Sequence, residues 1–200
     1  MRCARCFILL IFCVVTVSPV AAEQQFVAGI AIDYPVLFER MKPWGEEAIQ
    51  RRSAVTWGVS ASAIEIHQAS IPGAKRLTGA SGMLEIARLK FAAGHQPDLD
   101  NVARRTMAVM LEYSIKIVTQ DVSVDRVSDL DGRRLSFEAE TGGWTRYGQA
   151  LLIHNPGRND FWHITILLMR RLLATFFVTS DRVYPKSILD TVRVVDKTAA

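Results

Sequence analysis

The chain has 200 residues, of which 50% are apolar and 22% are charged, and its formal net charge is +4. This composition is that of a globular protein and excludes collagen-like, coiled-coil and largely disordered chains. The length and the absence of repeats or long linkers predict one folded domain.

The first 22 residues have the three zones of a secretory signal peptide. A short basic start contains Arg2 and Arg5, an apolar run covers residues 6–17, and small residues follow. Ala22 and Glu23 flank the expected cleavage site, because small side chains stand at the positions that signal peptidase requires. The apolar run is shorter than the roughly 20 residues of a membrane-spanning helix. We therefore expect cleavage rather than the alternative, a retained N-terminal anchor.

Cleavage would leave residues 23–200 as a single mature domain, periplasmic or secreted, with no stable transmembrane anchor. All three cysteines lie in the removed segment, so the mature chain could form no disulfide. Loss of Arg2 and Arg5 leaves 22 basic against 20 acidic side chains, a net charge of +2. Because its positive and negative charges nearly cancel, the mature chain lacks the excess of basic residues that is typical of nucleic-acid-binding proteins.

The first part of the mature chain favours strands. Residues 26–34 predict a strand that ends before Pro35, and residues 46–51 predict a short helical patch. Residues 54–60 and 63–71 predict a hairpin, and residues 83–92 alternate as a strand, although a short helix is also compatible with them. A long amphipathic helix then follows from Asp98 or Asp100 to Tyr113, since either aspartate can cap it.

The second half carries mostly strand signals. Strands are expected at 115–127, 134–140, 147–154 and 161–169, and the turns between them at 129–132, 141–143 and 155–160. Residues 161–179 are apolar enough to suggest a membrane span, but Arg170 and Arg171 in their middle make two buried strands the better interpretation. A short helix is expected after Pro185. Antiparallel hairpins combined with one long helix predict an α+β fold.

Five strings stand out at strand edges and core positions: Asp33-Tyr34-Pro35, IARLKFAAGHQPDLD at 86–100, VSVDRVSDLDGRRLSFEAE at 122–140, FWHITILL at 161–168 and SILDTVRV at 187–194. They resemble the PsbP-like group, which includes the DcrB-type periplasmic proteins. The resemblance covers nearly all of the mature chain, and it implies a central, mainly antiparallel sheet covered by helices on both faces. It also implies an accessory or binding factor rather than an enzyme. The loop at 71–82, Asp131 and Arg133 depart from the family pattern.

Histidines are the natural candidates for metal or acid–base chemistry. His154 and His163 flank the turn at 155–160 and are the candidate metal ligands, because they can approach each other across that hairpin. A metal site needs three or four converging ligands, and no cysteine is available to help. Scattered histidines are therefore the favoured interpretation, with no metal and no cofactor. The four tryptophans are expected in the core or at its rim rather than around a ligand.

No serine elbow and no phosphate-binding glycine loop is present. The sequence therefore predicts an exported, non-catalytic binding or accessory protein of the bacterial envelope, with a protein or small molecule as its unnamed partner. The alternative is an envelope enzyme with a histidine-containing, metal-dependent site. Converging imidazoles and carboxylates in one pocket would favour that alternative.

Overall fold

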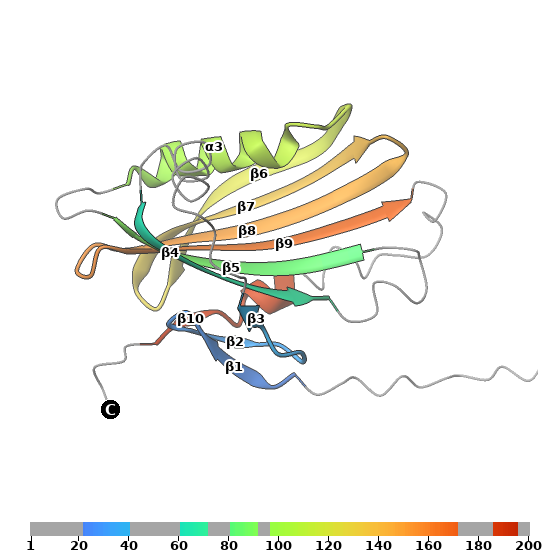
Figure 1. Cartoon of the computed structure of the whole chain (residues 1–200). Coiled ribbons are helices and arrows are strands. Elements are labelled where there is room, and N and C mark those ends of the chain that lie inside the picture. Colours follow the sequence, from blue (N-terminus) through green and yellow to red (C-terminus); the bar gives the residue numbers. More distant parts are fainter. Residues whose placement is uncertain (1–21, 41–60, 72–80, 92–96, 172–185, 196–200) are drawn as a thin grey trace, which may run out of the picture.

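The computed structural model describes residues 22–40, 61–71, 81–91, 97–171 and 186–195, and most of them form antiparallel strands around one long helix (Figure 1). Among these residues, a seven-stranded sheet has the order β3-β4-β5-β9-β8-β7-β6, and a three-stranded sheet has the order β1-β2-β10. The elements are β1 (Gln24–Val27), β2 (Ile30–Asp33), β3 (Glu39–Arg40), β4 (Ala61–Ser70), β5 (Ser81–Phe91), α3 (Leu99–Leu111), β6 (Lys116–Val127), β7 (Leu130–Thr141), β8 (Trp144–Asn155), β9 (Asp160–Arg171) and β10 (Arg193–Val194).

Long hairpins join the strands β6 to β9 in chain order. The β6–β7 turn consists of Ser128 and Asp129 at φ 50° and 64°, and the β7–β8 turn of Gly142 and Gly143 at φ 51° and 83°. Two positive φ values in succession are what a type I′ hairpin requires. The first turn therefore comes earlier than the expected 129–132, because the serine–aspartate pair rather than Gly132 takes the left-handed positions.

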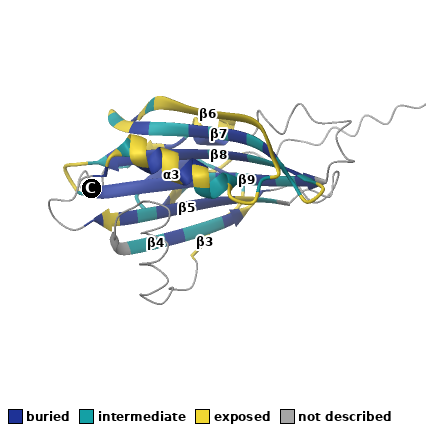
Figure 2. Ribbon diagram, turned by 90° about the horizontal axis from the view of Figure 1, so that it is seen from above, coloured by how far each residue is buried: buried dark blue, intermediate teal, exposed yellow. Residues whose placement is uncertain are grey.

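The seven-stranded sheet separates two apolar cores. On one face α3 packs over β7 and β8 and buries Val102, Ala103, Thr106 and Met107 (Figures 1 and 2). Gly148 is required here, since a Cβ at this position would overlap the ring of Phe137 on the neighbouring strand. On the other face, the three-stranded sheet and a helical turn at residues 186–189 close the second core.

The expected α+β fold, with a sheet covered by helices on both faces, is wrong, because the described residues form mostly β structure in two antiparallel sheets. The long helix α3 covers one face within the described residues, and the small sheet packs on the other together with the single helical turn at 186–189. The physical reason lies in residues 26–34, which were expected to form one strand. Ala28 and Gly29 adopt φ 49° and 83°, so the segment folds back as β1 and β2 and buries Ile30 and Ile32 against the large sheet.

Other local expectations are confirmed. Residues 81–91 are strand rather than helix, and Asp98 caps α3 by accepting N–H groups from Asp100 and Asn101. The helix ends at Leu111, so Tyr113 is exposed instead of buried. The predicted elements at 46–51 and 54–60 and the signal segment up to residue 21 lie outside the described residues. The hairpin turn was expected at 60–62, but residues 61 and 62 already belong to β4.

Within the described part of the chain, no helix is both long and apolar enough to cross a membrane. The apolar stretch that begins at residue 161 starts as strand β9, in which Arg170 is buried. Residues 172–179, the expected second strand of that stretch, lie outside the described residues.

Candidate functional site

A pocket of about 180 Å³ lies at the end of the large sheet where three turns and β10 meet. The three turns connect β1 to β2, β6 to β7 and β8 to β9. The pocket is therefore built from segments that lie far apart in the sequence. The described residues that line the pocket are Gly29, Arg88, Ser128, Leu130, Asn155, Arg158, Trp162, Val194 and Val195.

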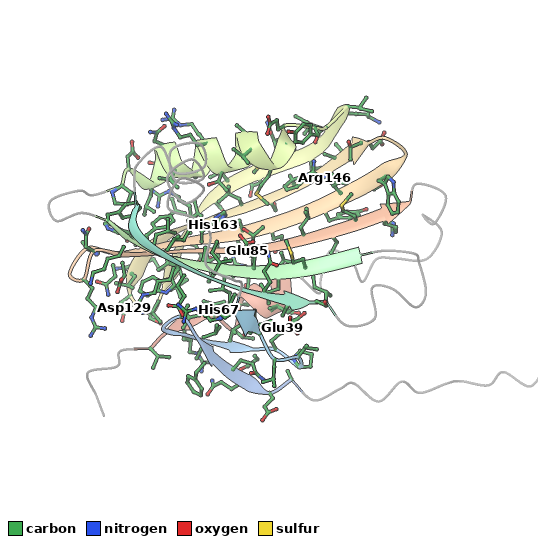
Figure 3. All side chains as sticks on the ribbon, in the orientation of Figure 1. Glu39, His67, Glu85, Asp129, Arg146 and His163 are labelled. Carbon is green, nitrogen blue, oxygen red and sulfur yellow. The ribbon has the colours of Figure 1, made fainter. Side chains whose placement is uncertain are left out.

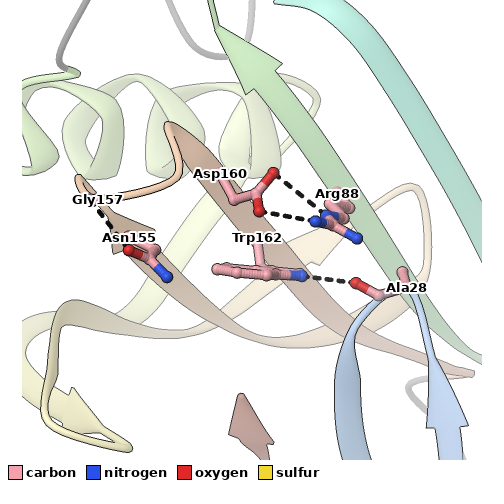
Figure 4. A network of polar contacts seen from close by, with 6 residues as sticks. All are labelled: Ala28, Arg88, Asn155, Gly157, Asp160 and Trp162. Atoms are coloured by element: carbon pink, nitrogen blue, oxygen red, sulfur yellow. Dashed lines mark hydrogen bonds and ion pairs between the residues drawn. The ribbon is translucent and has the colours of Figure 1, made fainter. Parts of the chain in front are cut away.

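An ion pair orders one side of the pocket (Figure 4). Arg88 on β5 binds Asp160 at the start of β9, with Nη2 at 2.7 Å from Oδ2 and Nε at 3.3 Å from Oδ1. The Arg88 side chain is 30% exposed and that of Asp160 only 5%. The guanidinium also lies 5.6 Å from the ring centre of Trp162, within the range of a cation–π contact. These contacts hold the arginine in one orientation.

The β1–β2 turn is tied to the same group. The indole N–H of Trp162 donates to the carbonyl oxygen of Ala28 at 2.8 Å. Gly29 follows in the left-handed region, where a Cβ would come within 3.2 Å of Arg88 Nη1. Glycine therefore serves two needs at this position, its positive φ and its close approach to the arginine.

The opposite wall is held mostly by backbone and hydroxyl groups. The Ser128 hydroxyl accepts the N–H of Val194 at 3.0 Å, and the N–H of Val195 donates to the Gly29 carbonyl at 3.0 Å. In the β8–β9 turn, the Asn155 side chain accepts the N–H of Gly157 at 3.1 Å. This Asx turn presents the exposed Arg158 at the pocket.

The pocket thus combines two guanidinium groups, an amide and a hydroxyl with the apolar surfaces of Trp162 and Leu130. Asp160 pairs with Arg88, and Arg158 brings the second guanidinium group to the lining. Guanidinium groups bind carboxylates and phosphates through a planar set of donors. The volume is below the roughly 300–1,000 Å³ of pockets that hold drug-sized ligands. The arrangement suits a small acidic group.

The candidate metal ligands lie elsewhere. The register pairs His154 with Phe161 and His163 with Leu152, which places both histidines on the α3 face of the sheet. His163 is 2.9 Å from the Thr165 hydroxyl. Burial lowers the pKa of His154. Among the described residues, no three histidine, cysteine, aspartate or glutamate side chains come close enough to hold a metal ion.

The remaining predicted site residues are also placed. Figure 3 shows His163 along the sheet, away from Asp129 at the end of the β6–β7 hairpin. His67 lies beside Glu65, with its Nε2 at 2.7 Å from the carboxylate. Ala22 and Glu23 precede β1, and the Glu23 carbonyl accepts the N–H of Tyr34 at 2.9 Å. His95, Trp44 and Trp57 lie outside the described residues.

Sequence reasoning did not identify the pocket. Arg88, Ser128, Arg158 and Val194 come from four separate segments, and only the fold brings them together. Trp162 was expected in the core or at its rim, and it is both buried and part of the pocket lining. The strong turn at 155–160 is the local signal that could have pointed to the pocket, because binding residues are common on loops at the ends of strands.

No family model matches the chain, and no curated protein matches it. Among solved structures, it is similar to PA94 of Pseudomonas aeruginosa, a protein of unknown function, with 13% identity over 63% of this chain and 81% of that chain and a TM-score of 0.42. It is also similar to LpqN of Mycobacterium tuberculosis, which is involved in cell envelope biogenesis, with 9% identity over 67% and 85% of the two chains and a TM-score of 0.42. Neither is named as PsbP-like or DcrB-type, and at these scores neither assigns a function to this chain.

Proposed function

We propose that this chain is an exported, non-catalytic binding protein of the cell envelope, and that its pocket holds the acidic group of a small ligand. The observation that carries the proposal is the Arg88 guanidinium, oriented by Asp160 and Trp162 at the wall of a pocket that Arg158 also lines. An arginine fixed before the ligand arrives loses little conformational freedom on binding, and such preorganisation favours affinity.

Export is supported by the N-terminal sequence. The basic start, the apolar run and the small residues before Glu23 follow the pattern of a cleaved signal. The mature net charge of +2 also favours a small acidic ligand over nucleic acid, which would need a broad basic surface.

Binding rather than catalysis is supported by the lining. Among the described lining residues, Ser128 carries the one hydroxyl, and that hydroxyl already accepts the N–H of Val194. A serine nucleophile needs a base within hydrogen-bond reach. His154 and His163 lie on the α3 face of the sheet, whereas Arg88 and Trp162 belong to the opposite face. His67 shares the face of Arg88, but its Nε2 lies 2.7 Å from the Glu65 carboxylate and it is not among the described lining residues.

The proposal is tested by thermal-shift and calorimetric titration of the mature protein. The probes are short carboxylates and methyl phosphate, each paired with a neutral analogue such as propionamide. We expect acidic probes to bind, the neutral ones not to bind, and every probe to be recovered unchanged. Arg158→Ala should weaken binding, while Arg104→Ala on the exposed side of α3 should leave it unchanged. Equal binding of acidic and neutral probes, or conversion of a probe to a product, would overturn the proposal.

A further inference from the structure

Strand β6 is an open edge of the large sheet. It is the last strand in the sheet order, so one of its backbone edges pairs with no other strand among the described residues. Figure 2 shows it along one rim of the sheet, exposed over most of its length. The strand has twelve residues and contains no proline. Natural proteins usually protect such edges by short strands, prolines, central lysines or a covering loop.

One side of β6 is mainly apolar although it is exposed to solvent, and its polar residues are Gln120, opposite Phe137, and Arg126, opposite Asp131. The register pairs Ile117 with Ala139 and Val122 with Leu135, and both partners are buried in the core beneath α3. These residues and Val124 therefore point to the α3 side, beyond the reach of the helix. Their exposed fractions are 48%, 43% and 75% for Ile117, Val122 and Val124. Isolated apolar side chains are ordinary on a surface, but a row along one strand marks an interaction site.

The other side of β6 is acidic. Thr119, Asp121, Ser123 and Asp125 point away from α3, and this side carries no lysine or arginine between Thr119 and Asp125. Asp125 is balanced by Arg134 of β7 at 2.8 Å. Asp121 is exposed and makes no ion pair with the described residues. Glu138 stands diagonally across from it on β7, since the register pairs Glu138 with Thr119.

We propose that β6 is the docking edge for an extended segment of another protein in which apolar and basic side chains alternate. The backbone of that segment would pair with the free N–H and C=O groups of β6 and extend the sheet by one strand. Its apolar side chains would cover Ile117, Val122 and Val124, and its basic side chains would face Asp121. Opposite charges across neighbouring strands stabilise the pair.

A second copy of this chain fits the same edge poorly. If two β6 strands paired about a two-fold axis at Asp121, that residue would face itself, and an axis at Ser123 would set Asp121 opposite Asp125. Axes at Val122 or Val124 place carboxylates of the two copies diagonally across from each other. Like charges on facing strands destabilise the pair. The basic residue on this side of β6, Lys116, lies at the start of the strand and pairs with Glu140 of β7 at 3.5 Å.

The test uses fluorescent peptides of the same length as β6. One alternates valine and lysine, a second alternates valine and glutamate, and a third is the valine–lysine peptide with every backbone amide N-methylated. Binding to the mature protein is followed by fluorescence anisotropy. Asp121→Lys and Val122→Lys change the two sides of β6, and Ala108→Lys adds the same charge at an exposed position of α3. Circular dichroism checks the fold of each variant. If Val122→Lys does not fold, Asp121→Lys, at an exposed position, decides the test.

We expect the valine–lysine peptide to bind and the other two to bind weakly. Asp121→Lys and Val122→Lys should each weaken binding about tenfold, and Ala108→Lys should not. Three results would each overturn the proposal. They are equal binding of the N-methylated or glutamate peptide, no binding of any peptide to the folded protein, and a dimer in analytical ultracentrifugation that Val122→Lys dissociates. The last result would make a second copy the occupant of this edge.

Discussion

The guanidinium of Arg88 and the carboxylate of Asp160 form a two-contact ion pair between β5 and β9, at 2.7 and 3.3 Å. The register sets Arg88 opposite Trp162 rather than opposite Asp160, so the pair runs diagonally across the two strands. Asp160 is also the residue at which the β8–β9 turn ends. One interaction therefore fixes both the arginine of the pocket and the turn that carries Arg158.

Asp160→Asn should destabilise the protein by about 2–3 kcal/mol. Breaking a fully buried ion pair costs roughly 3–5 kcal/mol, and water can reach part of Arg88 and reduce that loss. Urea unfolding at pH 7 measures the free energy. The control is Asp131→Asn, whose carboxylate is 78% exposed and 3.9 Å from Arg126, and which should cost below about 1 kcal/mol. Equal losses for the two variants would contradict the structural role of Asp160.

Ile164→Ala should cost about 2–5 kcal/mol, because Ile164 is fully buried and its removal leaves a cavity. Arg158→Ala at the exposed turn should cost below about 1 kcal/mol. Chemical denaturation of both variants provides the comparison. If Arg158→Ala were as damaging as Ile164→Ala, the assignment of residues 155–160 to a surface turn would be wrong.

Acid should destabilise the protein through His154. Burial lowers the pKa of this imidazole below its usual 6.5, and its Nε2 has no hydrogen-bond partner among the described residues. Below pH 6.5 the His154 imidazole is therefore protonated in the unfolded chain, whereas in the folded chain it stays neutral until the pH reaches its lowered pKa. The stability present above that pH declines as the pH falls through the lowered pKa. His154→Leu should flatten this decline between pH 7 and 5 in urea titrations, and His67→Gln should retain it. A decline of the same size in His154→Leu would assign it to other groups.

The mature protein should begin at Glu23 and be insensitive to thiol reductants. Edman sequencing of the protein purified from the envelope determines its first residue, and thermal melts with and without reductant should coincide because no cysteine remains. An intact Met1 or Arg2, or a melting temperature that falls in reductant, would show that the N-terminal cysteines are retained.

Alternating side chains predicted most of the large sheet. Arg133 and Arg134 illustrate why, since neighbours in a strand point to opposite faces. Arg133 contacts Asp100 of α3 at 2.6 Å, and Arg134 contacts Asp125 and Asp190 on the other side. Leu151, Leu152, Ile164 and Ile166 are buried in the strands predicted at 147–154 and 161–169. Of these four, only Leu152 lies under α3, because the other three alternate onto the opposite face.

The small sheet and the pocket could not be predicted in the same way. Ala28 is an uncommon residue at a positive φ, so the local sequence favoured a continuous strand, and the tertiary bond from Trp162 to Ala28 helps to hold the turn. The pocket depends on contacts between residues more than 60 positions apart, such as Val194 with Ser128 and Arg88 with Asp160. Local patterns contain no information about such pairs.

The central claim is that the pocket binds an acidic group. Its most direct test is proton–nitrogen NMR of protein labelled on the tryptophan indoles. Trp162 lines the pocket, and Trp144 lies at the opposite end of β8, in the β7–β8 hairpin. The chain has four tryptophans, so Trp162→Phe and Trp144→Phe assign these two signals, and propionate or methyl phosphate is then titrated against wild type. We predict a saturable shift of the Trp162 indole signal with Trp144 unmoved, no response to propionamide, and a weakened response in Arg158→Ala. An unmoved Trp162 signal, or equal shifts of both indoles, would contradict the account.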